Sequence, residues 1–126
     1  MRMISNAIGV AFKLRARAVA VDKAVELTIY RHGLMMQTRV MRNASGRPGP
    51  NTPTGDYRRS ITTQRIPDGV AVGTNSVQGR RLEFGFTGAD SLGRVYDQPP
   101  YPHFGPALED TKGPLIEALK KVVGDL

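Results

Sequence analysis

Apolar side chains recur every three, four or seven residues through the first third of the chain, and no other feature constrains the fold as much. The stripe consists of Ile4, Ile8, Ala11, Phe12, Ala18, Val21, Val25, Ile29, Met36 and Val40. This spacing places the side chains on one face of an α-helix. It predicts one long helix from about Ser5 to Arg42, with Ser5 or Asn6 as its N-cap.

Such a helix would be over 50 Å long, at about 1.5 Å per residue. A chain of 126 residues fits one domain and is too small to cover a rod of that length. We therefore expect part of the stripe to pack on another chain. Gly33 lies inside the pattern and predicts a kink or break next to His32.

Residues 43–55 contain three prolines and three glycines, which exclude regular pairing and predict a loop. Thr54 or Asp56 is a candidate cap for a short turn through Arg59. Ile- and Thr-rich residues 60–66 and Val-rich residues 69–74 then read as a β-hairpin around Pro67-Asp68-Gly69. A short helical turn is expected over residues 76–84.

The last third of the chain predicts an arm and a second helix. Residues 86–105 show no clear period but hold Phe86, Tyr96, Tyr101 and Phe104, which favours an extended binding arm over a spacer. Residues 106–126 predict a C-terminal helix that Gly113-Pro114 should interrupt or kink. The expected fold class is α+β in a single domain, with the long helix, a small antiparallel sheet and the C-terminal helix packed on that sheet.

Positive charge is concentrated in the first half of the chain. Residues 1–65 contain 12 Lys or Arg and 3 Asp or Glu, whereas residues 66–126 contain 6 Lys or Arg and 8 Asp or Glu. The net charge of the whole chain is +7. A basic surface attracts nucleic acid or an acidic protein, and electrically unlike ends suit head-to-tail packing in a ring. A solvated basic helix face accounts for the charge equally well.

The sequence offers few groups for chemistry. Cysteine is absent and the only histidines are His32 and His103, so disulfides are excluded and a zinc site is not expected. No membrane-spanning run, signal peptide or phosphate-binding glycine loop is recognisable. Glu83 lies close to Arg80 and Arg81 in the sequence. We interpret this group either as a charged functional site or, preferably, as an ion pair that fixes a turn or a contact between subunits.

Four motifs follow the loop in order. They are Pro53-Thr54-Gly55-Asp56-Tyr57-Arg58-Arg59-Ser60-Ile61, Val72-Gly73-Thr74, Leu82-Glu83-Phe84-Gly85, and Pro102-His103-Phe104-Gly105-Pro106-Ala107-Leu108. In this order they resemble the gene-product-ten-like family of long-tailed (lambdoid) phages, whose members are head–tail joining, neck or tail-completion proteins. Tyr57, where the family has leucine, and Phe86, where it has threonine, depart from the pattern. So do Arg80-Arg81, where the family has Tyr-Ala before the glutamate.

The resemblance implies a structural virion protein without catalytic, cofactor or metal site. It implies a ring, expected to have six copies, that joins the DNA-filled head to the tail and lets DNA pass. Its partners would be head-closure or adaptor proteins on one side and tail terminator or tail tube proteins on the other, with no membrane. The ring would be assembled in the bacterial cytoplasm.

Under this reading the motif residues are candidate contacts between subunits: Pro53, Thr54, Gly55, Arg58, Ser60, Ile61, Gly73, Thr74, Glu83, Phe84, Gly85, Pro102, Phe104 and Pro106. Candidate contacts with DNA or an acidic neighbour are Arg47, Arg58, Arg59, Arg80 and Arg81. Three alternatives stay open: a tail terminator ring, a small basic protein that binds DNA without sequence preference, and an enzyme that uses Glu83, His103 and arginines.

Overall fold

A computed structural model describes residues 11–15, 23–67 and 69–124. The elements in chain order are β1 (Ala11–Arg15), α1 (Lys23–Asn43), α2 (Asp56–Arg59), β2 (Thr62–Ile66), β3 (Gly69–Gly73), α3 (Gln78–Phe84), β4 (Phe86–Ala89), β5 (Val95–Gln98) and α4 (Phe104–Gly124). Two helices of 21 residues and two small antiparallel sheets confirm the predicted α+β class.

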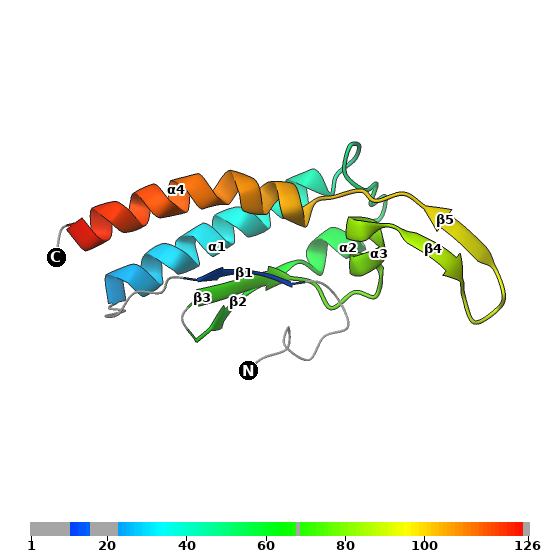
Figure 1. The fold of residues 1–126 in the computed structure, drawn as a ribbon, viewed down its shortest axis with the longest axis horizontal. Coiled ribbons are helices and arrows are strands. Elements are labelled where there is room, and N and C mark those ends of the chain that lie inside the picture. The colour runs from blue at the N-terminus through cyan, green and yellow to red at the C-terminus, as the bar shows by residue number, and fades with distance from the viewer. Residues whose placement is uncertain (1–10, 16–22, 68, 125–126) are drawn as a thin grey trace.

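Helix α1 lies between helix α4 and the larger sheet (Figure 1). The two long helices run antiparallel along the molecule, and β1, β2 and β3 cover the side of α1 that faces away from α4. The C-terminal helix therefore packs on α1. The expectation from the sequence that it packs on the sheet is wrong. The core lies at both faces of α1 and is formed by Val25, Ile29, Met36, Val40, Ala44, Tyr57, Ile61, Val70, Val72, Phe104, Ala107 and Leu115.

The larger sheet has the order β1-β3-β2, and both pairs are antiparallel. Strand β3 lies in the centre and is buried from Val70 to Gly73, as expected for a strand with neighbours on both sides. The predicted hairpin is confirmed as β2 and β3, with Thr62 opposite Gly73 and Ile66 opposite Gly69.

The predicted long N-terminal helix is wrong over its first part. Residues 11–15 form a strand that pairs Ala11 with Gly73 and Arg15 with Gly69, and the helix begins only at Lys23. The proposed caps Ser5 and Asn6 lie outside the described residues. At 21 residues α1 is about 30 Å long. Its apolar stripe is covered within the chain, so helix length gives no argument for a second chain.

Neither predicted helix interruption occurs. Helix α1 continues through His32 and Gly33, and α4 continues through Gly113 and Pro114. Proline removes one backbone donor, which leaves the carbonyl of Asp110 without its helical partner. Asp110, Gly113 and Pro114 are all exposed, so water can hydrogen-bond to that carbonyl.

Residues 86–98 form a two-stranded arm that projects from the end of the molecule opposite the C-terminal end of α4 (Figure 1). Its two strands alternate between half-buried and exposed residues. The predicted extended arm is thus a hairpin over most of its length. Phe104, counted among its aromatic residues, is instead the first residue of α4 and is fully buried.

Gly33 is required by the close approach of α1 to β3. A Cβ atom on Gly33 would lie 2.7 Å from Val70 Cγ2 and 3.1 Å from Thr63 Cγ2. We predict that Gly33→Ala lowers the free energy of unfolding by about 1–3 kcal/mol, because overpacking outweighs the better helix propensity of alanine. Urea denaturation measures it. Gly124→Ala, with no atom within 4 Å of the added Cβ, is the control and should change stability by less than about 0.5 kcal/mol.

Candidate functional site

Glu83 caps the N-terminus of α4. Its side chain is 4% exposed. Its Oε1 accepts hydrogen bonds from the backbone N–H groups of His103 (2.9 Å) and Phe104 (2.8 Å), and its Oε2 accepts one from Gly105 (3.0 Å). Amides in the first turn of a helix have no partner inside the helix, and a negative charge there is favoured by the helix dipole. One carboxylate thus ties α3 to α4.

His103 is fully buried beside this cap and bonds at both ring nitrogens. Nδ1 lies 2.9 Å from the carbonyl oxygen of Tyr101 and Nε2 lies 2.6 Å from the hydroxyl oxygen of Tyr57. A carbonyl can only accept, so Nδ1 carries the proton and Nε2 of the neutral ring accepts from the phenol. The two rings meet edge to face, with centroids 5.4 Å apart.

Burial perturbs both of these side chains. Burial lowers the pKa of His103, although the hydrogen bond to Tyr101 and the charge of Glu83 act in the opposite direction. Burial and the nearby charge of Glu83 raise the pKa of Tyr57. Both groups are therefore neutral at physiological pH, and both hold a hydrogen bond.

A second set of short contacts joins α2, β3 and α3. The Ser60 hydroxyl donates to the carbonyl of Tyr57 and lies 2.6 Å from the Thr74 hydroxyl, which also accepts from the Ser76 amide at 3.0 Å. Gly79 allows α3 to come this close, because an added Cβ would lie 2.7 Å from Thr74 Cγ2. Tyr57, Ser60, Thr74 and Glu83 with His103 form what we call the junction.

The structure brings most of the predicted motif residues together in or beside the junction. Among the proposed subunit contacts, Gly55, Ile61, Gly73, Thr74, Glu83 and Phe104 are buried inside the chain. Pro53, Thr54, Phe84, Pro102 and Pro106 are exposed, and Arg58, Ser60 and Gly85 are partly exposed. The buried members of the four motifs therefore stabilise the fold of this chain.

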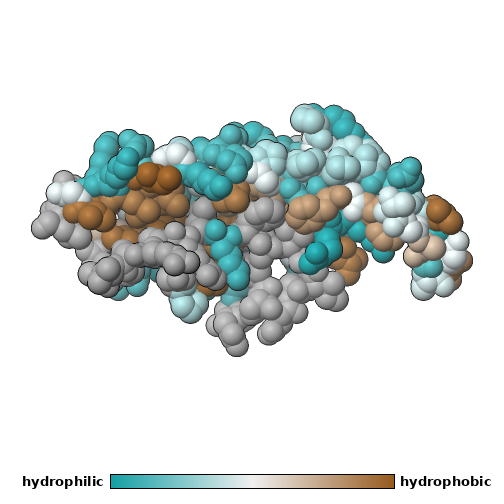
Figure 2. Space-filling view, viewed as in Figure 1, coloured by the Kyte–Doolittle hydropathy of each residue, from teal (hydrophilic) through white to brown (hydrophobic). Residues whose placement is uncertain are grey.

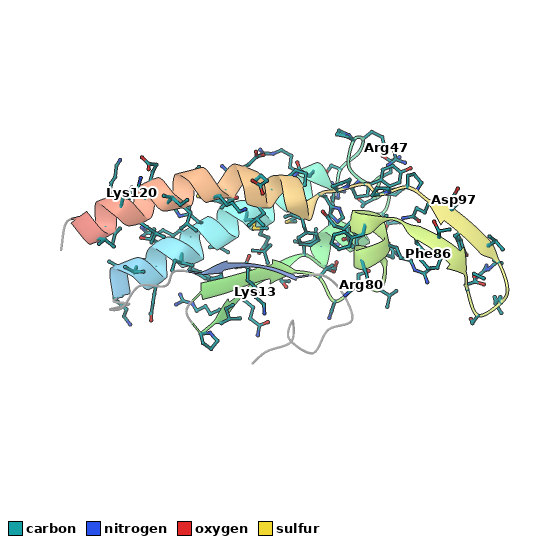
Figure 3. The ribbon with its side chains drawn as sticks, in the orientation of Figure 1. Lys13, Arg47, Arg80, Phe86, Asp97 and Lys120 are labelled. Atoms are coloured by element: carbon teal, nitrogen blue, oxygen red, sulfur yellow. The ribbon has the colours of Figure 1, made fainter. Side chains whose placement is uncertain are left out.

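Glu83 makes no ion pair with Arg80 or Arg81, so that expectation is wrong. Both arginines are exposed on α3, and the Arg81 guanidinium lies 3.8 Å above the Phe86 ring. Nor do the five candidate arginines form one patch. Figure 3 shows Arg47 and Arg80 on opposite sides of the molecule, and Arg47 stacks on Tyr101 at 3.8 Å.

The junction is poorly suited to catalysis. Both oxygens of Glu83 and both ring nitrogens of His103 are occupied by bonds within the chain, and neither side chain is open to a substrate. A general base needs access to the proton it removes. Among the described residues, no group of three His, Cys, Asp or Glu is placed to hold a metal ion.

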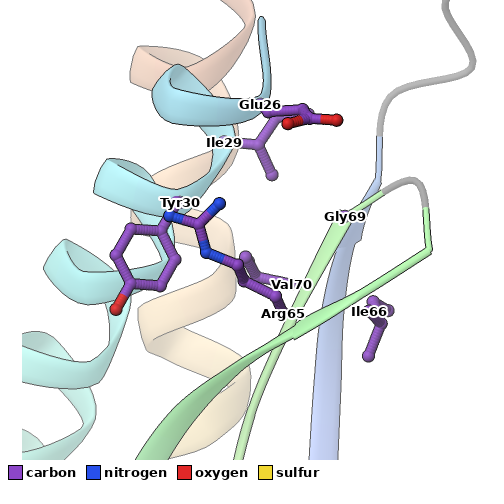
Figure 4. Close-up of a pocket in the computed structure, with 7 residues that line it drawn as sticks. All are labelled: Glu26, Ile29, Tyr30, Arg65, Ile66, Gly69 and Val70. Carbon is purple, nitrogen blue, oxygen red and sulfur yellow. The ribbon is translucent and has the colours of Figure 1, made fainter. Parts of the chain in front are cut away.

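A separate cavity of about 140 Å³ lies between α1 and the end of the β2–β3 hairpin (Figure 4). The Arg65 guanidinium stacks on Tyr30 at 4.3 Å along its wall. Ligand pockets usually measure about 300–1,000 Å³, so this cavity is too small for most metabolites. No helix in the described part of the chain has the length and apolar character needed to cross a membrane.

Sequence reasoning missed Tyr57 and His103 as members of the junction, and Gly79 as the residue that lets α3 approach Thr74. In the sequence, Tyr57 is noticeable only because the phage family has leucine at this position. His103 is noticeable only as a histidine in a proline-rich loop. The one signal was the presence of a polar aromatic residue in each of their two motifs. Their contact joins positions 46 residues apart, which no local pattern reveals.

Comparison with known proteins gives no further guide. No protein-family model matches the chain, and no curated protein and no solved structure is significantly similar to it. The resemblance to phage joining proteins therefore rests on the motifs alone and stays a prediction.

We predict that Glu83→Gln lowers the free energy of unfolding by about 2 kcal/mol, since the amide replaces one acceptor with a donor that faces the N–H of Gly105. Urea denaturation gives the value. Glu109→Gln, on the exposed face of α4 beside Lys112, makes the same chemical change and should cost less than about 0.5 kcal/mol. Equal losses of stability in the two variants would mean that capping by Glu83 does not stabilise the protein.

Stability should fall as the pH drops below about 6.5, the pKa of an unfolded histidine. The unfolded chain then takes up a proton that buried His103, with its lowered pKa, does not. Urea midpoints at pH 7.5 and 5.5 measure the loss. His103→Asn should flatten the profile, because the variant lacks the buried imidazole. A profile as steep as that of the parent protein would contradict the assignment.

Proposed function

We propose that the protein is a structural subunit of the head–tail connector of a long-tailed phage, and that it acts by joining other proteins rather than by catalysis. The observation that carries the proposal is the projecting arm. An isolated two-stranded hairpin is marginally stable in water, and both faces of this one are at least partly exposed. Such an arm gains stability by packing against another subunit.

The tip of the arm presents apolar side chains in a fixed shape. Leu92 is 75% exposed and Val95 is 81% exposed. The turn between the strands is organised by Asp90, whose carboxylate accepts bonds from the amides of Leu92 and Arg94 and from the side chains of Arg94 and Tyr96. Although desolvation opposes them, these hydrogen bonds lower the pKa of Asp90, so the turn stays charged and bonded at neutral pH.

The base of the arm is held rigidly to the body. A Cβ atom on Gly85 would lie 2.8 Å from the carbonyl oxygen of Gln98, the amide of Tyr101 donates to Leu82, and the Gln98 side chain donates to Arg81. Phe86 and Tyr96 pack with ring centroids 6.0 Å apart. Because Glu83 also links α3 to α4, these contacts connect the arm to the helical body.

A complementary apolar surface lies at the other end of the molecule. Ile116 and Val123 on α4 are exposed, and with Leu119 they line a shallow apolar depression near the helix end. Figure 2 shows apolar side chains near this end of α4 and on the arm, with both hydrophilic and apolar residues between them. Apolar surfaces at opposite ends favour head-to-tail contacts, and these generate a ring when the rotation between subunits closes.

The first test is deletion of the gene from a phage or inducible prophage that carries it, with lysates imaged by negative-stain electron microscopy. DNA-filled heads beside unattached tails of normal length support the neck position. Unattached, over-long tails instead support the tail terminator position within the same assembly. Intact infectious particles reject the connector function, and restoration by a plasmid-borne copy is the control.

We predict that Leu92→Asp or Val95→Asp abolishes complementation in this assay, because a charge at the tip cannot be buried against an apolar neighbour without a partner. Val77→Asp is the matched control, since Val77 is exposed but lies before α3 and outside the arm. Plaque counts measure complementation, and thermal melts verify that each variant is folded. Full complementation by the arm variants would exclude the arm as an essential contact.

A further inference from the structure

Two shallow hollows lie between the end of α1 and helix α2. One is lined by Met41, Arg42, Ser45, Gly55, Arg58 and Arg59, and the other by Ser45, Asn51, Thr52, Pro53 and Arg58. They share Ser45 and Arg58, which form the ridge between them. The residues that line them include three arginines and no aspartate or glutamate.

The Arg58 guanidinium is held in place by one hydrogen bond, but one of its N–H donors has no acceptor among the described residues. Its Nη1 donates to the Ser45 hydroxyl at 3.1 Å, and this hydroxyl donates in turn to the carbonyl of Met41 at 2.9 Å. Its Nε is buried and has no hydrogen-bond partner. A buried donor without an acceptor is costly, so the arrangement favours an arriving acceptor toward which Arg58 can turn its Nε–H edge.

Arg58 and Arg59 converge on the backbone of Gly55. A Cβ atom on Gly55 would lie 3.1 Å from Arg58 Nη2 and 3.0 Å from Arg59 Nη1. Two guanidinium groups that approach one point repel each other unless an anion lies nearby. The carboxylate of Asp56 pairs with Arg59 on the exposed side of α2.

The end of α1 does not cancel this positive charge. Arg42 is exposed in the last turn of α1 and forms no ion pair with another residue that the structure describes. The carbonyls of Val40, Met41 and Arg42 already accept bonds from the Ala44 amide, the Ser45 hydroxyl and the Ser45 amide. The hollow beside Met41 therefore offers hydrogen-bond donors and a surplus of positive charge.

We propose that Arg42, Arg58 and Arg59, with Ser45, form a binding site for a phosphate group. Guanidinium groups bind phosphate oxygens through paired N–H donors, and such charge-assisted bonds are stronger than neutral ones. The phosphate belongs to the backbone of nucleic acid or to a free phosphate ion. The nucleic-acid source rests on the proposed connector function, in which DNA passes the subunit; the site itself does not.

The test measures binding of a fluorescein-labelled DNA duplex to the purified protein by fluorescence anisotropy, from about 50 to 200 mM salt. Arg58→Gln and Arg42→Gln should each weaken binding about tenfold and lower the salt slope by about 1. Arg31→Gln is the matched control, because Arg31 is exposed on α1 some 16 Å along the helix from Arg42. Equal losses in all three variants would overturn the proposal in favour of diffuse attraction.

A second variant separates binding from folding. Ser45→Asp keeps every arginine and places a carboxylate beside Arg58, so it should retain the thermal midpoint of the parent protein and lose DNA affinity about tenfold. Unchanged affinity in this variant would exclude the site as a contact with nucleic acid.

Inorganic phosphate, added at constant ionic strength, distinguishes the two sources. If it raises the thermal midpoint of the parent protein but not of Arg58→Gln, while DNA affinity is the same in all variants, the site binds free phosphate. If neither DNA nor phosphate responds to these variants, the proposal is wrong. None of these readouts depends on particle assembly, so they can fail while the connector function holds, or the reverse.

Discussion

The carboxylate of Glu83 is the contact on which the rest of the structure depends. It accepts hydrogen bonds from the amide of His103 and from the amides of the first two residues of α4, and it comes from α3, the next element after the central strand β3. Together with the packing of α4 on α1, this buried carboxylate fixes where α4 begins relative to the sheet. Without this carboxylate the first amides of the helix would be buried with no acceptor.

The junction also decides what the protein can do. Its polar groups face one another, so Tyr57, His103 and Glu83 stabilise geometry and leave nothing free for a substrate. The groups still open to partners lie outside it: the apolar tip of the arm, the apolar end of α4, and the arginines beside Ser45. A rigid centre with contacts at its periphery suits a protein that assembles with others.

The sequence predicted the elements whose signal is local. The β2–β3 hairpin follows from Pro67 and Gly69 between two β-prone runs, and the core face of α1 follows from Val25, Ile29, Met36 and Val40. It failed at residues 11–15, where Ala11 and Phe12 fit the helical stripe while Phe12 and Leu14 also fit a strand alternation. The choice between the two depends on pairing with Val70 and Val72, more than 50 residues away. The same limit hid the arm strands, whose pairing is read only in three dimensions.

The sequence by itself determined the α+β class, the loop at residues 43–55, the hairpin and the helical face that forms the core, because periodicity and turn residues act over a few positions. Of the candidate site it determined the membership of Glu83, Ser60 and Thr74, but not their roles. Tertiary structure decided that Glu83 caps a helix instead of pairing with Arg80, that Tyr57 meets His103, and that Arg58 and Arg59 converge on Gly55. These contacts join residues brought together only by packing, and the partner of a buried polar group is whichever group the folded backbone places within about 3 Å of it.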